Sequence, residues 1–251
     1  MTAPWSFLDH PGPIPFAHRG GASEHSENTM AAFGYAVRLG YRYVETDVHT
    51  TADGALVAFH DDVLDRVTDR QGKIAALSWS EVRQARVAGE AIPLLEDVLG
   101  AWPDLRVNID PKHDASVEPL VDVLRRTNAH DRVCVGAFSE PRLERVRRLT
   151  GGRVCTGMGT RAVARLRMAS LGGPGGRFGG NCAQVPVRQG PVVLVDRRFV
   201  AAAHRRGLAV HVWTIDDAAE MARLLDLGVD GIMTDRPAIL KEVLTARGQW
   251  A

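Results

Sequence analysis

Carboxylates with the spacing of a metal site follow two short apolar runs of this chain. The run YVETDVH carries Glu45 and Asp47, and the run RVNIDPK carries Asp110. Residues two apart on a strand project from the same face, so Glu45 and Asp47 are expected to point together. With Asp110 they would offer three hard oxygen ligands with no cysteine nearby, which suits Mg²⁺ or Ca²⁺ better than zinc or copper.

Histidines and cations occupy comparable positions at the ends of apolar runs. The first apolar run of the chain ends in His18 and Arg19, within FAHRGGASEHSENT. A further apolar run, ALVAFH, ends in His60. Lys112 lies two residues after Asp110. Two histidines can flank a substrate as base and acid. A divalent metal, an arginine and a lysine together suit a phosphate group, because charge builds on its oxygens in the transition state.

Each of these residues also has an ordinary structural explanation. A single buried carboxylate is usually a salt-bridge partner, and a lone histidine at a strand end is more often structural than catalytic. A whole cluster at predicted strand ends is harder to explain by packing, because buried charges must be paired or bound to a metal. We therefore interpret the cluster as a functional site.

The elements that must position this cluster alternate between strand and helix. Apolar, β-branched runs predict strands at 14–18, 42–48, 105–110, 132–137, 153–156, 181–185, 208–213 and 229–234. Amphipathic stretches predict helices at 28–39, 94–101, 115–128, 140–149, 160–170, 196–206, 216–227 and 236–246. This pattern favours a (β/α)8 TIM barrel, which carries catalytic residues at the carboxyl ends of its strands. The alternative, a doubly wound sheet, would normally have a glycine-rich first turn that HRGGAS does not match.

Local signals mark boundaries within this pattern. Residues 55–93 predict a small insertion after the second strand, with ALVAFH as an extra strand and SWSEVRQARV as a short helix capped by Ser80. Asp216 or Asp217 is the expected N-cap of a later helix. The glycine-dense residues 171–181 follow a helix, so we expect them at the end of the barrel away from the chemistry.

Composition excludes several classes of function. The chain has 31 Lys and Arg against 30 Asp and Glu, so no overall field indicates nucleic acid or an acidic membrane as partner. Its length and 45% hydrophobic content fit one large domain or two small ones, and the barrel pattern favours a single domain, 1–251. No apolar run approaches the roughly 20 residues that span a bilayer, and the N-terminus lacks the pattern of a signal peptide. We expect a cytoplasmic protein without an integral membrane segment, and its oligomeric state is not predicted.

The chain has three cysteines, Cys134, Cys155 and Cys182. They are odd in number, lie far apart within apolar runs, and match no zinc-binding spacing. We expect buried free thiols, as in a protein of a reducing compartment.

Five ordered motifs near the N-terminus resemble the opening of the glycerophosphodiester phosphodiesterases. The family pattern has His-Arg-Gly, Glu-Asn-Thr, Glu-x-Asp-Val, an Asp-Gly pair and His-Asp, and all five occur here at compatible spacing. The segments VHVWTIDD and GVDGIMTDRP resemble the family's C-terminal signature. The resemblance is strongest over 16–69 and 208–237, and the middle of the chain carries no specific motif.

The resemblance implies a TIM barrel with a small insertion after the second strand. It also implies metal-dependent cleavage of a glycerophosphodiester to sn-glycerol 3-phosphate and an alcohol. The implied roles are acid and base for His18 and His60, metal ligands for Glu45, Asp47 and Asp110, and substrate binding or orientation for Arg19, Lys112, Trp213, Glu27 and Asn28. Glu27 could instead be a carboxylate near a helix N-terminus, and Trp213 could belong to the core.

One departure from the family pattern affects the site. The family usually has Glu-x-Lys on the third strand, where this chain has Asp110-Pro111-Lys112. Because aspartate is one methylene shorter, the metal would sit deeper or bind through water at that corner. Pro111 has no N–H, so we expect it at a strand end.

Two other functions stay open. Related barrels of phospholipase D type release a cyclic phosphate from lysophospholipids, which would favour an apolar rim and often an export signal. The other possibility is a non-catalytic barrel that only binds phosphodiesters. The sequence does not determine the head group, the choice of Mg²⁺ or Ca²⁺, which histidine is the acid, or whether water or a substrate hydroxyl attacks.

Overall fold

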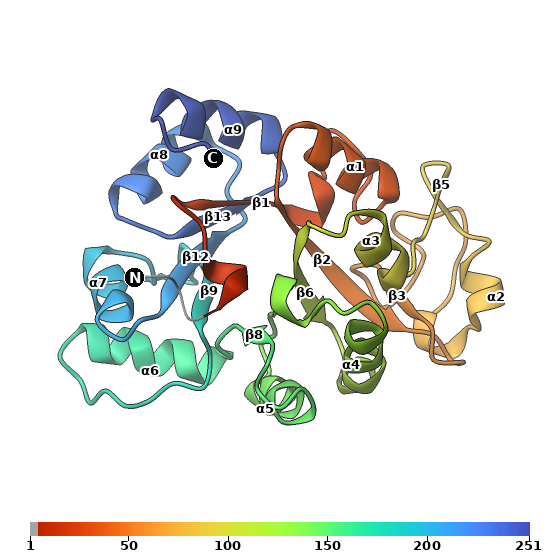
Figure 1. Ribbon diagram of the computed structural model, residues 1–251, viewed down its shortest axis with the longest axis horizontal. Coiled ribbons are helices and arrows are strands. Elements are labelled where there is room, and N and C mark those ends of the chain that lie inside the picture. The colour runs from red at the N-terminus through yellow and green to blue at the C-terminus, as the bar shows by residue number, and fades with distance from the viewer. Residues whose placement is uncertain (1–4) are drawn as a thin grey trace.

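Eight parallel strands surround one axis in the computed structural model, which describes residues 5–251 (Figure 1). Residues 1–4 of the predicted domain 1–251 lie outside the described residues. The strands are β1 (Ile14–Ala17), β2 (Tyr43–Thr50), β6 (Arg106–Pro111), β7 (Val133–Val135), β8 (Cys155–Thr156), β9 (Cys182–Pro186), β12 (Ala209–Trp213) and β13 (Gly231–Thr234). Their order is β8-β7-β6-β2-β1-β13-β12-β9, and one parallel bridge, Gly157 to Cys182, links the two ends. The predicted (β/α)8 barrel is confirmed, with Pro111 at a strand end.

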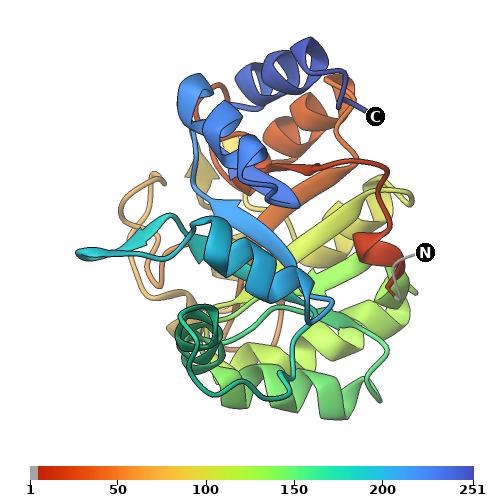
Figure 2. The ribbon, with the colours of Figure 1, turned by 90° about the vertical axis from the view of Figure 1, so that its left-hand side faces the viewer.

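Helices cover the outside of the barrel (Figure 2). They are α1 (Met30–Arg38), α3 (Leu95–Ala101), α4 (Val117–Arg126), α5 (Glu140–Leu149), α6 (Thr160–Ser170), α7 (Arg197–His204), α8 (Ala218–Asp226) and α9 (Pro237–Ala246). Asp217 caps α8 by accepting a hydrogen bond from the Glu220 amide. Asp216 instead accepts bonds from Thr234 Oγ1 and the Asp235 amide, which fixes the loop after β13.

Alternation along each strand separates two environments. Val133 and Val135 of β7 pack outward against helices, whereas Cys134 faces the barrel interior. In β12, Val210 and Val212 face outward. The amino end of the interior is filled by Phe7, Ile14, Phe16, Tyr43, Cys134, Cys155, Cys182 and Met233. The carboxyl end is therefore left for polar side chains.

The insertion lies between β2 and α3, as the sequence predicts. Strand β3 (Leu56–Ala58) pairs antiparallel with β2, and α2 (Trp79–Val82) is the short helix. The prediction of Ser80 as its cap is wrong, because Ser78, two residues earlier, is the N-cap and forms a reciprocal capping box with Glu81. The insertion has its own core of Val57, Phe59, Leu64, Ile74, Val82, Ala85, Val87 and Ile92.

Short elements complete the chain. They are the 3₁₀ turns η1 (Ser6–Leu8), η2 (His18–Gly20), η3 (Ile74–Ala76), η4 (Asp114–Ser116) and η5 (His130–Arg132), and the strand pairs β4 (Arg86–Val87) with β5 (Glu90–Ala91) and β10 (Arg188–Gln189) with β11 (Val192–Val193). The β10–β11 hairpin projects from the barrel in Figure 2. Within residues 5–251, no helix has both the length and the apolar character needed to cross a bilayer.

Candidate active site

A cavity of about 310 Å³ opens at the carboxyl ends of the strands. Catalytic residues of such barrels lie at this end. The lining includes most of the predicted site, namely His18, His60, Glu45, Asp47, Asp110, Arg19, Lys112 and Trp213. Glu27 and Asn28 do not line the cavity, and they contact residues that do. The fold thus gathers residues from β1, β2, β6, β12 and the insertion around one space.

The turn after β1 explains why glycines follow the first histidine. Arg19 has a φ of 51°, in the left-handed region, and Gly20 follows with a φ of 85°. A side chain at Gly20 would lie 2.8 Å from Ala32, so only glycine allows α1 to pack this closely. The turn directs the Arg19 amide to donate to Glu45 Oε2 over 3.1 Å. The left-handed backbone at Arg19 therefore directs polar groups into the site.

A carboxylate orients His18. Its Nδ1 lies 2.6 Å from Asp235 Oδ1, and its Nε2 lies 3.7 Å from Glu45 Oε2. Burial lowers the pKa of His18, but Glu45 and the hydrogen bond to Asp235 outweigh burial, so the pKa is raised above its ordinary value. The sequence shows Asp235 at a strand end, but its partnership with His18 comes from the fold.

We expect Asp235→Asn to lower the pKa of His18, because the substitution removes a negative charge that favours the imidazolium. In the pH profile of kcat/KM, the limb that reflects ionisation of His18 should then move to lower pH. This shift is expected whether His18 is the acid or the base. The measurement is kcat/KM across the neutral pH range. Asp226→Asn, which changes an exposed partner of Arg247 outside the cavity, is the matched control. An unmoved limb in Asp235→Asn would contradict this pairing.

His60 has a similar carboxylate partner. Its Nδ1 lies 2.6 Å from Asp61 Oδ1, and Arg66 in turn binds Asp61 through Nε at 2.5 Å. The hydrogen bond from Arg66 holds the pKa of Asp61 down at about 2, so this carboxylate stays charged. Both histidines thus present Nδ1 to a carboxylate, which leaves Nε2 as the nitrogen that can reach a substrate.

Strand register brings the acidic residues together. Asp47 of β2 is directly paired with Asp110 of β6, and Lys112 Nζ lies 2.5 Å from Asp47 Oδ1 and 2.9 Å from Asp110 Oδ2. Burial raises the pKa of Asp110 and, together with Asp47, raises that of Glu45 to about 7. Burial also opposes ionisation of Asp47, but Lys112 and Arg19 outweigh it and lower its pKa.

These carboxylates fit a hard divalent cation. Glu45 and Asp47 are 5% and 2% exposed, and burial, followed by the charge of Asp47, raises the pKa of Glu45, so a bound cation would favour its ionised form. Arg19 Nε is buried without a hydrogen-bond partner among the described residues, although it lies 3.3 Å from Asp47 Oδ2. Buried carboxylate oxygens are the donors that Mg²⁺ and Ca²⁺ prefer.

Two other groups within residues 5–251 could also hold a metal. Each brings three ligand atoms within 4.8 Å of one another, and the members are His49, Asp62 and His113 in one and Cys134, Cys155 and Cys182 in the other. The histidine group adjoins the site, because His49 Nε2 lies 3.0 Å from the His60 carbonyl oxygen. Glu45, Asp47 and Asp110 do not form such a group. The Lys112 ammonium lies between the carboxylates of Asp47 and Asp110.

Glu27 and Asn28 hold residues of the lining in place. Glu27 accepts a hydrogen bond from Arg19 at 3.2 Å and another from Arg66 at 2.6 Å. Asn28 donates to Asp47 Oδ2 at 3.3 Å. Both therefore act on the site through a neighbouring side chain, in keeping with the orienting role that the resemblance implies.

One side of the cavity is apolar. The rings of Trp213 and Phe138 meet edge to face at 6.0 Å, and Phe138 is 67% exposed. Met158, Val163 and Leu194 extend this wall. Trp213 is among the predicted site residues and Phe138 is not, although its position directly after the fourth predicted strand was an available signal.

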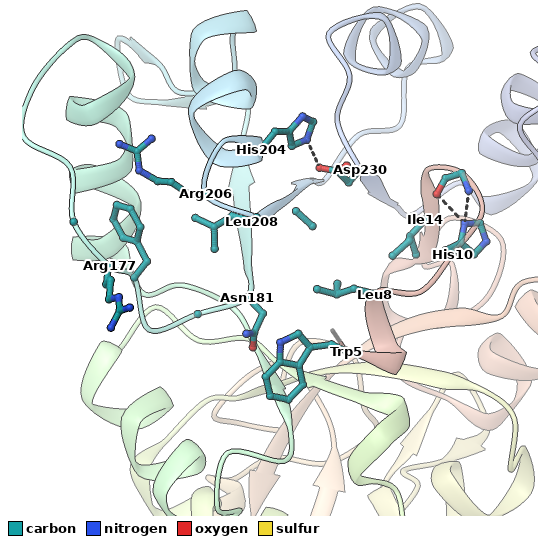
Figure 3. Close-up of a pocket in the computed structure, with 16 residues that line it drawn as sticks. Trp5, Leu8, His10, Ile14, Arg177, Asn181, His204, Arg206, Leu208 and Asp230 are labelled. Atoms are coloured by element: carbon teal, nitrogen blue, oxygen red, sulfur yellow. Dashed lines mark hydrogen bonds and ion pairs between the residues drawn. The ribbon is translucent and has the colours of Figure 1, made fainter. Parts of the chain in front are cut away.

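A larger cavity, of about 750 Å³, lies at the opposite end of the barrel (Figure 3). It is lined by the N-terminal segment around Trp5 and Leu8 and by the glycine-dense segment at Arg177, and His204 pairs with Asp230 over 2.7 Å at its edge. None of the predicted site residues lines it. Residues of the 171–181 segment thus lie at the end of the barrel opposite the predicted site residues, as expected.

Known proteins resemble this chain in sequence and in fold. The profile of the Glycerophosphoryl diester phosphodiesterase family matches residues 18–239. "Probable glycerophosphodiester phosphodiesterase 2" of Mycobacterium tuberculosis is 45% identical over 97% of this chain and 95% of its own length. "Lysophospholipase D GDPD1" of Homo sapiens is 27% identical over 91% and 85%. An Oleispira antarctica phosphodiesterase, solved with the product sn-glycerol-3-phosphate, has a TM-score of 0.80 at 23% identity and covers 93% of this chain and 97% of its own. The chain belongs to the Glycerophosphoryl diester phosphodiesterase family.

Proposed function

We propose that this enzyme is a metal-dependent hydrolase that cleaves glycerophosphodiesters to sn-glycerol 3-phosphate and an alcohol. The observation that carries the proposal is the pair of histidines, His18 and His60, each backed by a carboxylate at Nδ1 and both lining one cavity. One imidazole accepts the proton of the attacking oxygen, and the other donates a proton to the leaving alkoxide. The two histidines thereby exchange charge states over one turnover.

The charged residues are proposed to hold and activate the phosphate. Glu45, Asp47 and Asp110 would hold Mg²⁺ or Ca²⁺, and the bound ion would supply a Lewis acid for the phosphate oxygens. Arg19 and Lys112 add fixed positive charge at the same end of the cavity, where it stabilises charge that builds in the transition state. Glu27 and Asn28 keep Arg19 and Asp47 in position.

The apolar wall supports a substrate whose alcohol is larger than the glycerol unit. Trp213 and Phe138 offer ring surface beside the charged end of the cavity, which suits the head group. The same wall favours a second candidate, cleavage of lysophospholipids, because Phe138 is exposed and could contact an acyl chain. The human relative's name gives that activity for the relative.

A panel of substrates tests both functions. We expect release of sn-glycerol 3-phosphate from one or more of the choline, ethanolamine, glycerol and inositol glycerophosphodiesters when Mg²⁺ or Ca²⁺ is present, and none after EDTA treatment. A lysophospholipid belongs to the panel, with phosphorus NMR to detect a cyclic phosphate. Cyclic product from the lysophospholipid alone would favour the second candidate. Tight binding of every substrate without turnover would contradict both and indicate a binding protein.

A small-molecule substrate and a cytoplasmic location complete the proposal. The balanced charge gives no support to a nucleic-acid partner, and the cysteines, which are free and buried, suit a reducing compartment.

A further inference from the structure

Three cysteines that are distant in sequence converge inside the barrel. Cys134, Cys155 and Cys182 lie on the neighbouring strands β7, β8 and β9 and all face the interior. Their sulfur atoms all lie within 4.8 Å of one another, and the Cys134 and Cys182 sulfurs are 3.8 Å apart. Each residue is at most 1% exposed. Packing of one apolar layer does not require three thiols at a single point.

The distance of 3.8 Å between the Cys134 and Cys182 sulfurs is compatible with a tetrahedral metal. Zinc binds thiolates at about 2.3 Å with tetrahedral angles, which places two bound sulfurs about 3.8 Å apart. Soft thiolate ligands select zinc over Mg²⁺ or Ca²⁺. The donor set here therefore differs in kind from the carboxylates of the catalytic cavity.

A buried nitrogen without a partner among the described residues lies on β12, the strand that pairs with the strand of Cys182. His211 of β12 is fully buried, and its Nε2 has no hydrogen-bond partner in the described part of the chain. Strand β12 pairs with β9, and its register places Ala209 opposite Cys182 and His211 opposite Gln184. Since buried polar atoms are nearly always satisfied, an orphaned imidazole nitrogen indicates a missing ligand. His211 is not part of the group of ligand atoms that lie within 4.8 Å of one another, so ligation would require its ring to move toward the sulfurs.

We propose that Cys134, Cys155 and Cys182 bind one zinc ion inside the barrel, with His211 Nε2 as the fourth ligand. Each thiol loses its proton as its Zn–S bond forms, so loading releases three protons. Ligation through Nε2 puts the ring proton on Nδ1. That nitrogen lies 3.4 Å from Gln184 Nε2, and Gln184 can accept the proton when its amide and that of Asn108, to which it donates, both turn over.

The site is separate from the catalytic centre. Gln184 and Asn108 line the floor of the catalytic cavity and are joined by a hydrogen bond of 2.8 Å. His211 lies beneath them, in contact with Gln184. On the other side, a cavity of about 230 Å³ reaches Cys155 from the amino end of the barrel and offers a route for the ion. The zinc would therefore not meet the substrate.

The position of the site indicates a structural role. Strand β8 has only two residues, and a single β-bridge between Gly157 and Cys182, with hydrogen bonds between Thr156 and Asn181, joins the β8 side to β9. The three cysteines lie on β7, β8 and β9, the strands on either side of this weakly paired junction. Metal binding to a site that the unfolded chain lacks adds to folding stability, so zinc would close the least paired part of the barrel.

Metal analysis of the protein tests the site without any assay of activity. The chain is produced in medium with zinc, treated with EDTA in the native state to clear the carboxylate site, and analysed by mass spectrometry. We expect about one zinc per chain to remain, and an organomercurial that attacks thiols should release it. Protein grown with cobalt should show the sulfur-to-metal charge-transfer absorption of a thiolate site. Wild-type protein that retains no metal, or that contains a Cys134–Cys182 disulfide, would overturn the proposal.

Variants assign the ligands. Cys182→Ser should lose the zinc, and His211→Phe should weaken its retention by roughly tenfold or more. Asp47→Asn, which alters the carboxylate site, and Ile14→Val, which alters the same interior layer, should keep it. Zinc retained equally in Cys182→Ser would refute the site. If Cys182→Ser does not fold, release of zinc from wild-type protein in proportion to added mercurial decides the question.

Discussion

Replacing His60 by alanine is expected to lower kcat by about 10²-fold or more, the usual scale for loss of a general acid or base. KM should change little, because the imidazole acts on the proton that moves in the transition state rather than on bound substrate. Steady-state kinetics with the best glycerophosphodiester of the panel is the measurement. Exogenous imidazole should restore part of the rate, because it can occupy the space that alanine leaves.

A histidine outside the cavity supplies the control. His204 lies on α7 and lines the cavity at the opposite end of the barrel, so His204→Ala should keep kcat within about twofold. A His60→Ala enzyme with the rate of His204→Ala would remove His60 from the catalytic pair. The proposed hydrolase function would then need another proton donor or acceptor.

The variant Glu45→Gln is expected to have opposite effects on activity and stability. Activity should fall by on the order of 10²-fold or more, because an amide cannot replace a carboxylate that holds the divalent cation. Stability of the metal-free protein above neutral pH should rise. Burial and Asp47 raise the pKa of Glu45 to about 7, so charging this side chain opposes folding.

The sign of the pH dependence follows from linkage. The folded-state pKa of about 7 lies above the ordinary value of 4.5, so between these values the folded protein binds more protons than the unfolded chain. The contribution of Glu45 to stability is therefore fully present below about pH 4.5 and is lost as the pH rises through about 7. In Glu45→Gln this dependence should disappear.

Thermal unfolding in EDTA and with added Mg²⁺ or Ca²⁺ measures both effects. The cation should raise the Tm of the wild-type protein above neutral pH and have little effect on Glu45→Gln. Glu118→Gln, which changes an exposed carboxylate paired with Arg145, is the control and should behave as wild type. A Glu45→Gln protein that gains as much Tm from the cation as wild type would show that Glu45 does not bind it.

The barrel and most of its lining were predictable because their signals are local. Alternation of apolar residues defines each strand, and helix caps such as Asp217 act within one turn. In a barrel, the carboxyl ends of all strands share one face, so residues at those ends, such as Glu45, Asp47 and Asp110, had to meet. The cap of α2 was misassigned although its capping-box signal, Ser78 with Glu81, is equally local.

Which of these residues touch depends on how distant segments of the chain pack together. His18 finds Asp235 across 217 residues of sequence, and Cys134 meets Cys182 across 48. Closure of the barrel brings its first and last strands together, and strand tilt sets which interior side chains share a layer. Neither barrel closure nor strand tilt is encoded in the spacing of residues along one strand. Local sequence patterns therefore define the strands and helices and the types of side chain at the strand ends. The packing of the folded chain sets which of these side chains contact one another.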